Sequence, residues 1–172
     1  MAFLLQMALQ CAVAFVATWA FAALFSVPPR QYLFCGLTGA AGWACYLAVM
    51  QMQPSAPFAS VAAALVLALM ARVFAARRCC PVTVFLISGI FPLVPGAGIY
   101  YTAYYFIMGD NALFAQNGAL TLKIAVAIAI GIVVVLALPS SMFRAFTKKN
   151  LHGARHEPAC EMRPPQGSDE EN

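Results

Sequence analysis

The longest uncharged stretch of this chain runs from Gln31 to Ala71, 41 residues without a single Asp, Glu, Lys or Arg. Segments 1–29 and 79–109 also lack these four residue types. A transmembrane helix needs about 20 mainly apolar residues, so the longest stretch has room for two spans. The chain of 172 residues is 9% charged, whereas an ordinary soluble domain is about 25% charged. These features predict an all-α, polytopic membrane protein.

Prolines and polar turns divide the apolar sequence into five predicted spans. Prolines 28 and 29 end the first span, because proline lacks an N–H and disfavours helix in the residue before it. The polar, proline-containing segment 51–57 and the segment 109–111 are typical of turns. We therefore expect helices at 2–27, 31–50, 58–75, 81–108 and 118–138, in a transmembrane domain covering 1–142. The polar segment 143–172 is predicted to be a disordered cytoplasmic tail.

The basic residues gather on one side of this five-span arrangement. They lie in the first loop, at the third loop or after the fifth helix: Arg30, Arg72, Arg77, Arg78, Arg144, Lys148, Lys149, Arg155 and Arg163. Because cytoplasmic loops are enriched in Lys and Arg, this pattern places the N-terminus outside and the C-terminus inside. We expect the membrane to be the cell inner (plasma) membrane. The net charge is only +4 and the basic residues form no continuous stripe, which argues against nucleic-acid binding.

The fourth predicted span is interrupted by Phe91-Pro92-Leu93-Val94-Pro95-Gly96-Ala97-Gly98. Two prolines followed by two glycines cannot lie in a regular helix without loss of backbone hydrogen bonds. We expect two half-helices, the second beginning between residues 96 and 99. In membrane transporters, such a half-helix offers backbone N–H groups and a positive dipole end to an anionic group. We interpret the break as a carboxylate site that Gly96 and Gly98 open to the ligand; the alternative is a kinked or re-entrant helix that binds nothing.

Polar residues near the break extend this candidate site. The hydroxyl groups of Tyr100, Tyr101 and Thr102 could line a polar path, whereas Tyr104 and Tyr105 fit an interfacial aromatic belt. Lys123 is the one cation placed within a span, where it either pairs with a substrate carboxylate or extends outward along its own methylene groups. The predicted substrate-binding residues are Pro92, Pro95, Gly96, Gly98, Tyr100, Tyr101, Thr102 and Lys123.

The predicted spans contain no Asp or Glu and no pairing of a nucleophile with a base. A carboxylate proton relay would therefore need a second chain, and we expect neither an enzyme nor a metal or cofactor site. Small residues four apart in the second and fifth helices allow close helix packing and a homo-oligomer.

Three sequence segments, taken in order, carry a resemblance to a known family. They are Phe25-Ser26-Val27-Pro28-Pro29-Arg30, then Ile90-Phe91-Pro92-Leu93-Val94-Pro95-Gly96 with Tyr100 and Thr102 after it, and a fifth helix that ends at Pro139. This order resembles the threonine/serine exporter family over about residues 5–142. More narrowly, it is similar to the short YjjB-type subunit, which corresponds to the C-terminal membrane half of full-length exporters. Pro92, Pro95 and Gly96 match the family motif, and Arg30 matches its loop position.

The resemblance implies a subunit that exports small amino acids such as threonine and serine, or dicarboxylates such as succinate. It also implies a YjjP-type partner, which carries the other membrane half and a soluble N-terminal region. The alternative is a non-transporting membrane scaffold or assembly subunit, in which the break serves helix packing alone.

Overall fold

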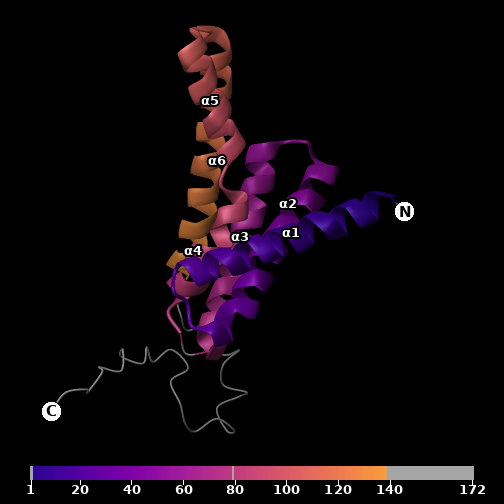
Figure 1. Cartoon of the computed structure of the whole chain (residues 1–172), viewed down its shortest axis with the longest axis vertical. Coiled ribbons are helices and arrows are strands. Elements are labelled where there is room, and N and C mark those ends of the chain that lie inside the picture. Colours follow the sequence, from indigo (N-terminus) through magenta and orange to yellow (C-terminus); the bar gives the residue numbers. More distant parts are fainter. Residues whose placement is uncertain (1, 79, 139–172) are drawn as a thin grey trace, which may run out of the picture.

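The computed structural model describes residues 2–78 and 80–138, which form helices joined by short connections (Figure 1). The helices are α1 (Ala2–Leu24), η1 (Pro29–Gln31), α2 (Tyr32–Met52), α3 (Ala56–Arg78), α4 (Val82–Ile90), η2 (Phe91–Leu93), α5 (Gly96–Met108) and α6 (Asn111–Ala137), where η marks a 3-10 helix. The described residues contain no strand, which confirms the predicted all-α class. The predicted tail, 143–172, and the predicted end of the transmembrane domain at 142 lie outside them.

Four helices, α1, α2, α3 and α6, are long and apolar enough to cross a membrane. The segment from α4 through η2 forms a fifth candidate span with α5, and the two parts meet at an angle of 52°. The described residues therefore hold four spans, or the predicted five when the bent pair counts as one.

The predicted start of the last helix, at residue 118, is wrong by seven residues, because α6 begins at Asn111. Gly109, with φ of 75°, reverses the chain in a left-handed conformation that glycine adopts without steric cost. The Asp110 carboxylate then accepts a hydrogen bond from the Leu113 N–H at 3.0 Å, which caps the new helix. Lys123 is consequently the thirteenth residue of its helix rather than the sixth.

Other helix boundaries also differ from the prediction by one to three residues; α2 ends at Met52 rather than 50, and α3 ends at Arg78 rather than 75. The third helix starts at Ala56 rather than 58, because Pro57 fits in a first helical turn, where its missing N–H costs nothing. The first helix ends at Leu24 rather than 27. There Ser26 adopts a positive φ of 54°, and the Val27 N–H donates to the carbonyl of Ala22 at 3.0 Å, a Schellman termination.

Small residues bring α3 close to its neighbours. The buried face of α3 consists mostly of alanines: Ala59, Ala63, Ala64, Ala68, Ala71 and Ala75. A Cβ atom added at Gly131 of α6 would lie 2.7 Å from the Cβ of Ala64 and 3.0 Å from the carbonyl oxygen of Val61. Helices in lipid gain stability from such close packing rather than from exclusion of water, so these contacts hold α6 against the bundle.

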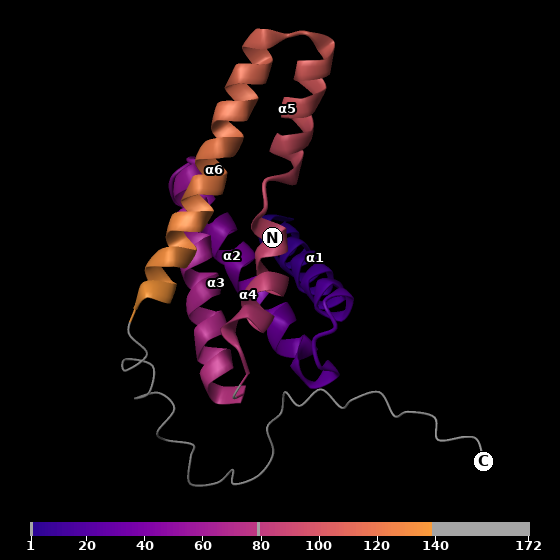
Figure 2. The ribbon, with the colours of Figure 1, turned by 90° about the vertical axis from the view of Figure 1, so that its left-hand side faces the viewer.

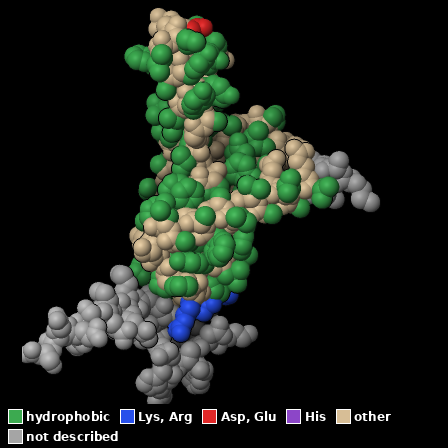
Figure 3. All heavy atoms as spheres, viewed as in Figure 1, with side chains coloured by type: hydrophobic (Ala, Val, Ile, Leu, Met, Phe, Trp, Pro, Cys, Tyr) green, Lys and Arg blue, Asp and Glu red, His purple; other side chains and the backbone are tan. Residues whose placement is uncertain are grey.

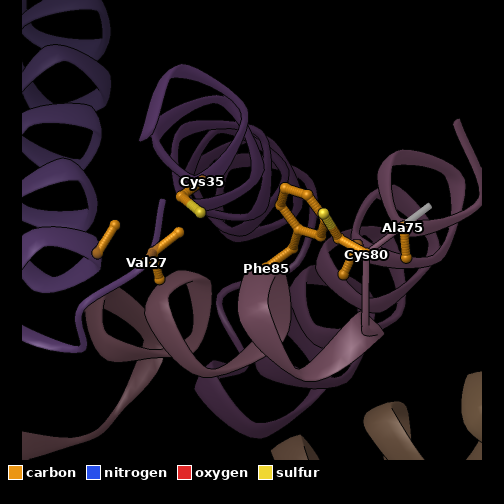
Figure 4. Close-up of a cluster of buried hydrophobic side chains, with 7 residues drawn as sticks. Val27, Cys35, Ala75, Cys80 and Phe85 are labelled. Atoms are coloured by element: carbon orange, nitrogen blue, oxygen red, sulfur yellow. The ribbon is translucent and has the colours of Figure 1, made fainter. Parts of the chain in front are cut away.

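Phe85 of α4 lies at the centre of a second group of buried side chains (Figure 4). It is fully buried, and the cluster also contains Val27, Cys35, Ala75 and Cys80. The first half of the broken span is thereby fixed among α1, α2 and α3. The position at which the break begins, at the end of α4, is therefore held by packing against these helices.

The upper part of the α5–α6 hairpin (residues 96–137), formed by α5 and the first part of α6, rises beyond the rest of the bundle (Figures 1 and 2). Helices α3 and α6 run in the same direction, since Gly131 packs on Ala64 and Arg72 reaches the carbonyl of Val135. In α3, the first residue, Ala56, lies eight residues before Ala64. In α6, Lys123 lies eight residues before Gly131, so Lys123 is level with the start of α3. The residues of α6 before Lys123 thus extend roughly 18 Å past the start of α3, at 1.5 Å per residue. The acidic side chain seen in Figure 3 lies at the tip of this hairpin, and the basic side chains visible in this view gather at the opposite end.

Candidate functional site

The broken span contains a short irregular segment between two helices. Pro92 lies in η2, and Pro95 precedes α5 with φ of −76° and ψ of 61°. The Val94 N–H donates to the carbonyl of Phe91 at 3.3 Å, and the Gly96 N–H donates to the carbonyl of Val94 at 2.8 Å. The two half-helices are therefore confirmed, although the irregular part ends at Pro95 and both glycines lie within α5.

The first turn of α5 presents backbone donors without acceptors. No side chain caps this helix. Within the described part of the chain, no hydrogen bond uses the N–H of Ala97 or Gly98. Gly96 and Ala97 are exposed, so an external ligand can approach this end of the helix. Together with the positive end of the helix dipole, these donors form a place suited to an anion.

The two glycines at this helix start have different surroundings. A Cβ atom at Gly96 would meet nothing within 4 Å, so the space beside its backbone is open. A Cβ atom at Gly98 would collide with the hydroxyl of Thr121 on α6. Gly96 therefore fits the predicted approach of a ligand, whereas Gly98 allows α5 and α6 to pack closely.

An apolar groove of about 880 Å³ is lined mainly by residues of α5 and α6. Of the predicted site residues, Pro95 and Thr102 line it. The hydroxyl of Thr102 donates to the carbonyl of Gly98 at 2.7 Å, and that of Thr121 to the carbonyl of Asn117 at 2.7 Å. Because both hydroxyl protons are used within their own helices, the groove offers little polar recognition of its own.

The four tyrosines of α5 lie on the surface of the hairpin rather than in this groove. Tyr100 and Tyr104 stack with ring centroids 6.4 Å apart, and Tyr101 and Tyr105 stack at 6.5 Å. Tyr100 is 63% exposed, the most of the four. A polar path and an aromatic belt both stay predictions for these residues.

Lys123 lies level with the break but faces away from it. Helices α5 and α6 are antiparallel, because Gly98 of α5 packs against Thr121 of α6 and Gly118 of α6 packs against Thr102 of α5. In this register, Gly96 lies at the level of Lys123. Thr121 and Ala125 line the groove, and Lys123 is roughly 200° around the helix from each. The exposed ammonium group therefore points to the opposite side of α6, and the structure does not bring it to the start of α5.

The buried hydroxyl groups of the described helices are hydrogen-bonded within their own helices. Each of these residues donates to a carbonyl four residues earlier, at 2.7–2.9 Å: Thr18, Thr38, Ser60 and Ser88. The exception is Gln31, whose side chain is fully buried and whose Oε1 and Nε2 have no partner in the described part of the chain. The sequence did not predict a buried role for Gln31. The one indication was that this polar residue stands beside Arg30 at the start of an apolar helix.

Comparison with known proteins identifies the family. The family described as "Threonine/Serine exporter, ThrE" matches residues 10–138. No curated protein and no solved structure matches this chain. The family match covers well over half of the chain and includes α2 to α6 and most of α1. With its apolar helices, this is a multi-pass membrane protein that belongs to the threonine/serine exporter family, a family of transporters.

Proposed function

We propose that this chain is a subunit of an exporter that moves small carboxylate-bearing metabolites across the cell inner (plasma) membrane. The substrate is threonine or serine, or a dicarboxylate such as succinate, and a YjjP-like membrane subunit completes the transporter. The observation that carries this proposal is the first turn of α5, where unpaired backbone donors face open space beside Gly96.

The chemistry of this helix start fits a carboxylate. The oxygens would accept hydrogen bonds from the N–H groups of Ala97 and Gly98, in the positive field of α5. A hydrogen bond to a charged group contributes about 1.5–3 kcal/mol, so two such bonds can hold an anion without a nearby cation. All the proposed substrates share this group, and the site alone does not distinguish among them.

The surroundings of the break support the proposal of a second subunit. The bundle residues satisfy their hydroxyl groups internally, and the groove beside α5 is open and apolar. A polar substrate would meet few hydrogen-bonding groups along this chain alone. A partner that packs over the start of α5 would supply the other wall of the path.

The charges support an orientation for the subunit. Arg30, Arg77 and Arg78 lie at one end of the bundle, opposite the hairpin tip with Asp110 (Figure 3). By the positive-inside rule, the arginine end faces the cytoplasm. The N-terminus and the hairpin tip would then face outward.

Substitution of Gly96 tests the site directly, because the structure has room for a side chain there. Cells that express the chain with its partner are loaded with a threonine-containing peptide or with succinate, and the intracellular substrate is measured over time. Gly96→Leu should abolish export at an unchanged membrane level, because its side chain covers the donors. Gly96→Ala should retain part of the activity, and Ala20→Leu, at an exposed position of α1, is the matched control.

Unchanged export in Gly96→Leu would show that the start of α5 is not the substrate site. No export of either substrate class by the wild-type chain, with and without the partner, would favour a scaffold or assembly role.

A further inference from the structure

The break between α4 and α5 must be held by side chains, because its backbone makes few hydrogen bonds. Pro92 and Pro95 have no N–H, and the two backbone bonds within the break join residues of the same segment. Neither bond reaches another helix. The direction in which α5 leaves the bundle therefore depends on the side chains that attach the break to its neighbours.

Phe91, the first residue of η2, packs on the end of α1. Its ring lies almost parallel to the ring of Phe21, at an angle of 10°, with the ring centroids 3.9 Å apart. At this distance the two ring faces are in van der Waals contact. The ring of Phe25, one turn after Phe21, adds a second contact with its centroid 5.6 Å from that of Phe91. Two aromatic side chains at the end of α1 thus hold the start of η2.

Leu93, the last residue of η2, attaches the break to different helices. It is 6% exposed and belongs to a buried cluster with Leu67 of α3 and Ile128 of α6. The next residue, Val94, is 42% exposed, and the start of α5 is exposed as well. Phe91 and Leu93 are therefore the two side chains that tie the break to the bundle just before α5 begins.

The α1 side of the break is otherwise loosely packed. A cavity of about 330 Å³ lies there, lined by Pro92, by residues of α1 such as Ala14 and Ala17, and by Trp43 of α2. A space of this size offers few atoms for van der Waals contact, so the stack of Phe91 on Phe21 is the close contact that holds η2 to α1. Loss of the stack would leave room for η2 to shift.

We propose that the stacked rings of Phe21 and Phe91 position the first turn of α5 for the substrate carboxylate. This inference rests on the proposed carboxylate site, and it makes both rings positioning residues that act through the break. With the stack intact, the unpaired N–H groups of Ala97 and Gly98 keep a fixed direction relative to the bundle. Without it, these donors no longer match the carboxylate, and the substrate binds less tightly.

Substitution by leucine tests this role, because leucine keeps an apolar side chain and removes the ring. Inverted membrane vesicles from cells that express the chain with its partner take up radiolabelled threonine or succinate over a range of concentrations. Phe21→Leu and Phe91→Leu should each raise KM about three- to tenfold, with the maximal rate within about twofold of the wild type at equal membrane level. The double variant should raise KM no further than the larger single effect, because both substitutions remove the same contact.

Two control variants separate the stack from general packing. Phe58→Leu is the matched substitution at a residue of α3 that is 56% exposed and makes no ring contact within the described residues. It should leave KM unchanged. Phe91→Tyr retains the ring and should keep KM close to that of the wild type.

Hydrogen exchange gives a readout that needs no transport. The amide of Ile99 donates to the carbonyl of Pro95 at 3.0 Å, the first helical hydrogen bond of α5. If the stack holds the start of α5, Phe91→Leu should speed exchange of this amide at least about threefold, whereas Phe58→Leu should not.

Three outcomes would overturn the inference: an unchanged KM in Phe21→Leu or Phe91→Leu, single effects that multiply in the double variant, or an equal rise of KM in Phe58→Leu. The proposed function stands in each of these cases, because the wild-type vesicles transport the substrate. If the wild-type vesicles take up neither substrate, the proposed function fails. Faster exchange at Ile99 in Phe91→Leu would then still support the stack as the contact that positions α5, and unchanged exchange would overturn it.

Discussion

The guanidinium group of Arg72 fastens the end of α6 to α3, and its removal should cost a predictable amount of stability. Its Nη1 atom donates to the carbonyl oxygens of Val135 at 2.6 Å and Leu138 at 2.7 Å. These carbonyls lie at the C-terminal end of α6, where the helix dipole favours a cation; the Val135 carbonyl also accepts the Leu138 N–H at 3.2 Å. The cation also lies near the end of the span, where its charge is tolerated.

The expected loss follows from these two hydrogen bonds. Each bond from a charged group contributes about 1.5–3 kcal/mol, and two bonds that share one nitrogen contribute less than twice that. Arg72→Met keeps much of the side-chain volume and removes both bonds, so we expect a loss of about 2–4 kcal/mol. For a chain of this length, 1 kcal/mol corresponds to about 2–4 °C in Tm, which gives a decrease of about 4–16 °C. Arg72→Lys should retain part of the stability, because lysine keeps the charge and loses the planar fork.

Thermal unfolding of the purified protein in detergent, followed by tryptophan fluorescence, measures this loss. Arg77→Met is the matched control, since it is the same substitution at an exposed position five residues later in α3. A Tm in Arg72→Met that matches the wild type, or an equal decrease in Arg77→Met, would refute the role of the two carbonyl bonds.

Three further substitutions test the packing and the helix ends. Gly131→Leu should separate α3 from α6, because its Cβ would collide with Ala64. The amount of folded protein in the membrane should then fall, which the yield of detergent-resistant protein measures. Gly96→Leu is the control and should leave this yield unchanged. Ser26→Gly should raise the Tm by a few degrees, since about 1 kcal/mol of strain at its positive φ disappears. Asp110→Ala should cost about 1 kcal/mol at the start of α6 and speed hydrogen exchange at Leu113, because the cap is lost.

The features that sequence predicted well depend on local covalent chemistry. Pro92 and Pro95 cannot both lie in the interior of one regular α-helix without loss of backbone hydrogen bonds, so the broken span could be recognised from their spacing. Runs of apolar residues likewise indicate spans without knowledge of tertiary contacts. The start of α6 was harder to predict, because Asp110-Asn111 is equally typical of a turn and of a helix start. The hydrogen bond from the Leu113 N–H to the Asp110 carboxylate shows that a helix begins there.

The features that sequence did not predict depend on how helices meet. The contact of Gly98 with Thr121 fixes the register of α5 against α6, and nothing in the local sequence of either helix specifies that pairing. The same register places Lys123 on the far side of α6, which separates it from the helix start that it was expected to join. The burial of Gln31 also follows from neighbouring helices and not from its own segment.

The packing of α5 has a mechanical consequence. This helix buries no residue of its own and packs mainly on α6, while α4 below it is fixed around Phe85. A rotation of α5 about the segment from Phe91 to Pro95 would therefore leave the bundle core intact, at the low free-energy cost typical of poorly buried elements. Such a pivot would move the far end of α5, at Met108, much farther than the unpaired N–H groups of Ala97 and Gly98, so a bound anion would stay beside the hinge while the wall above it moves.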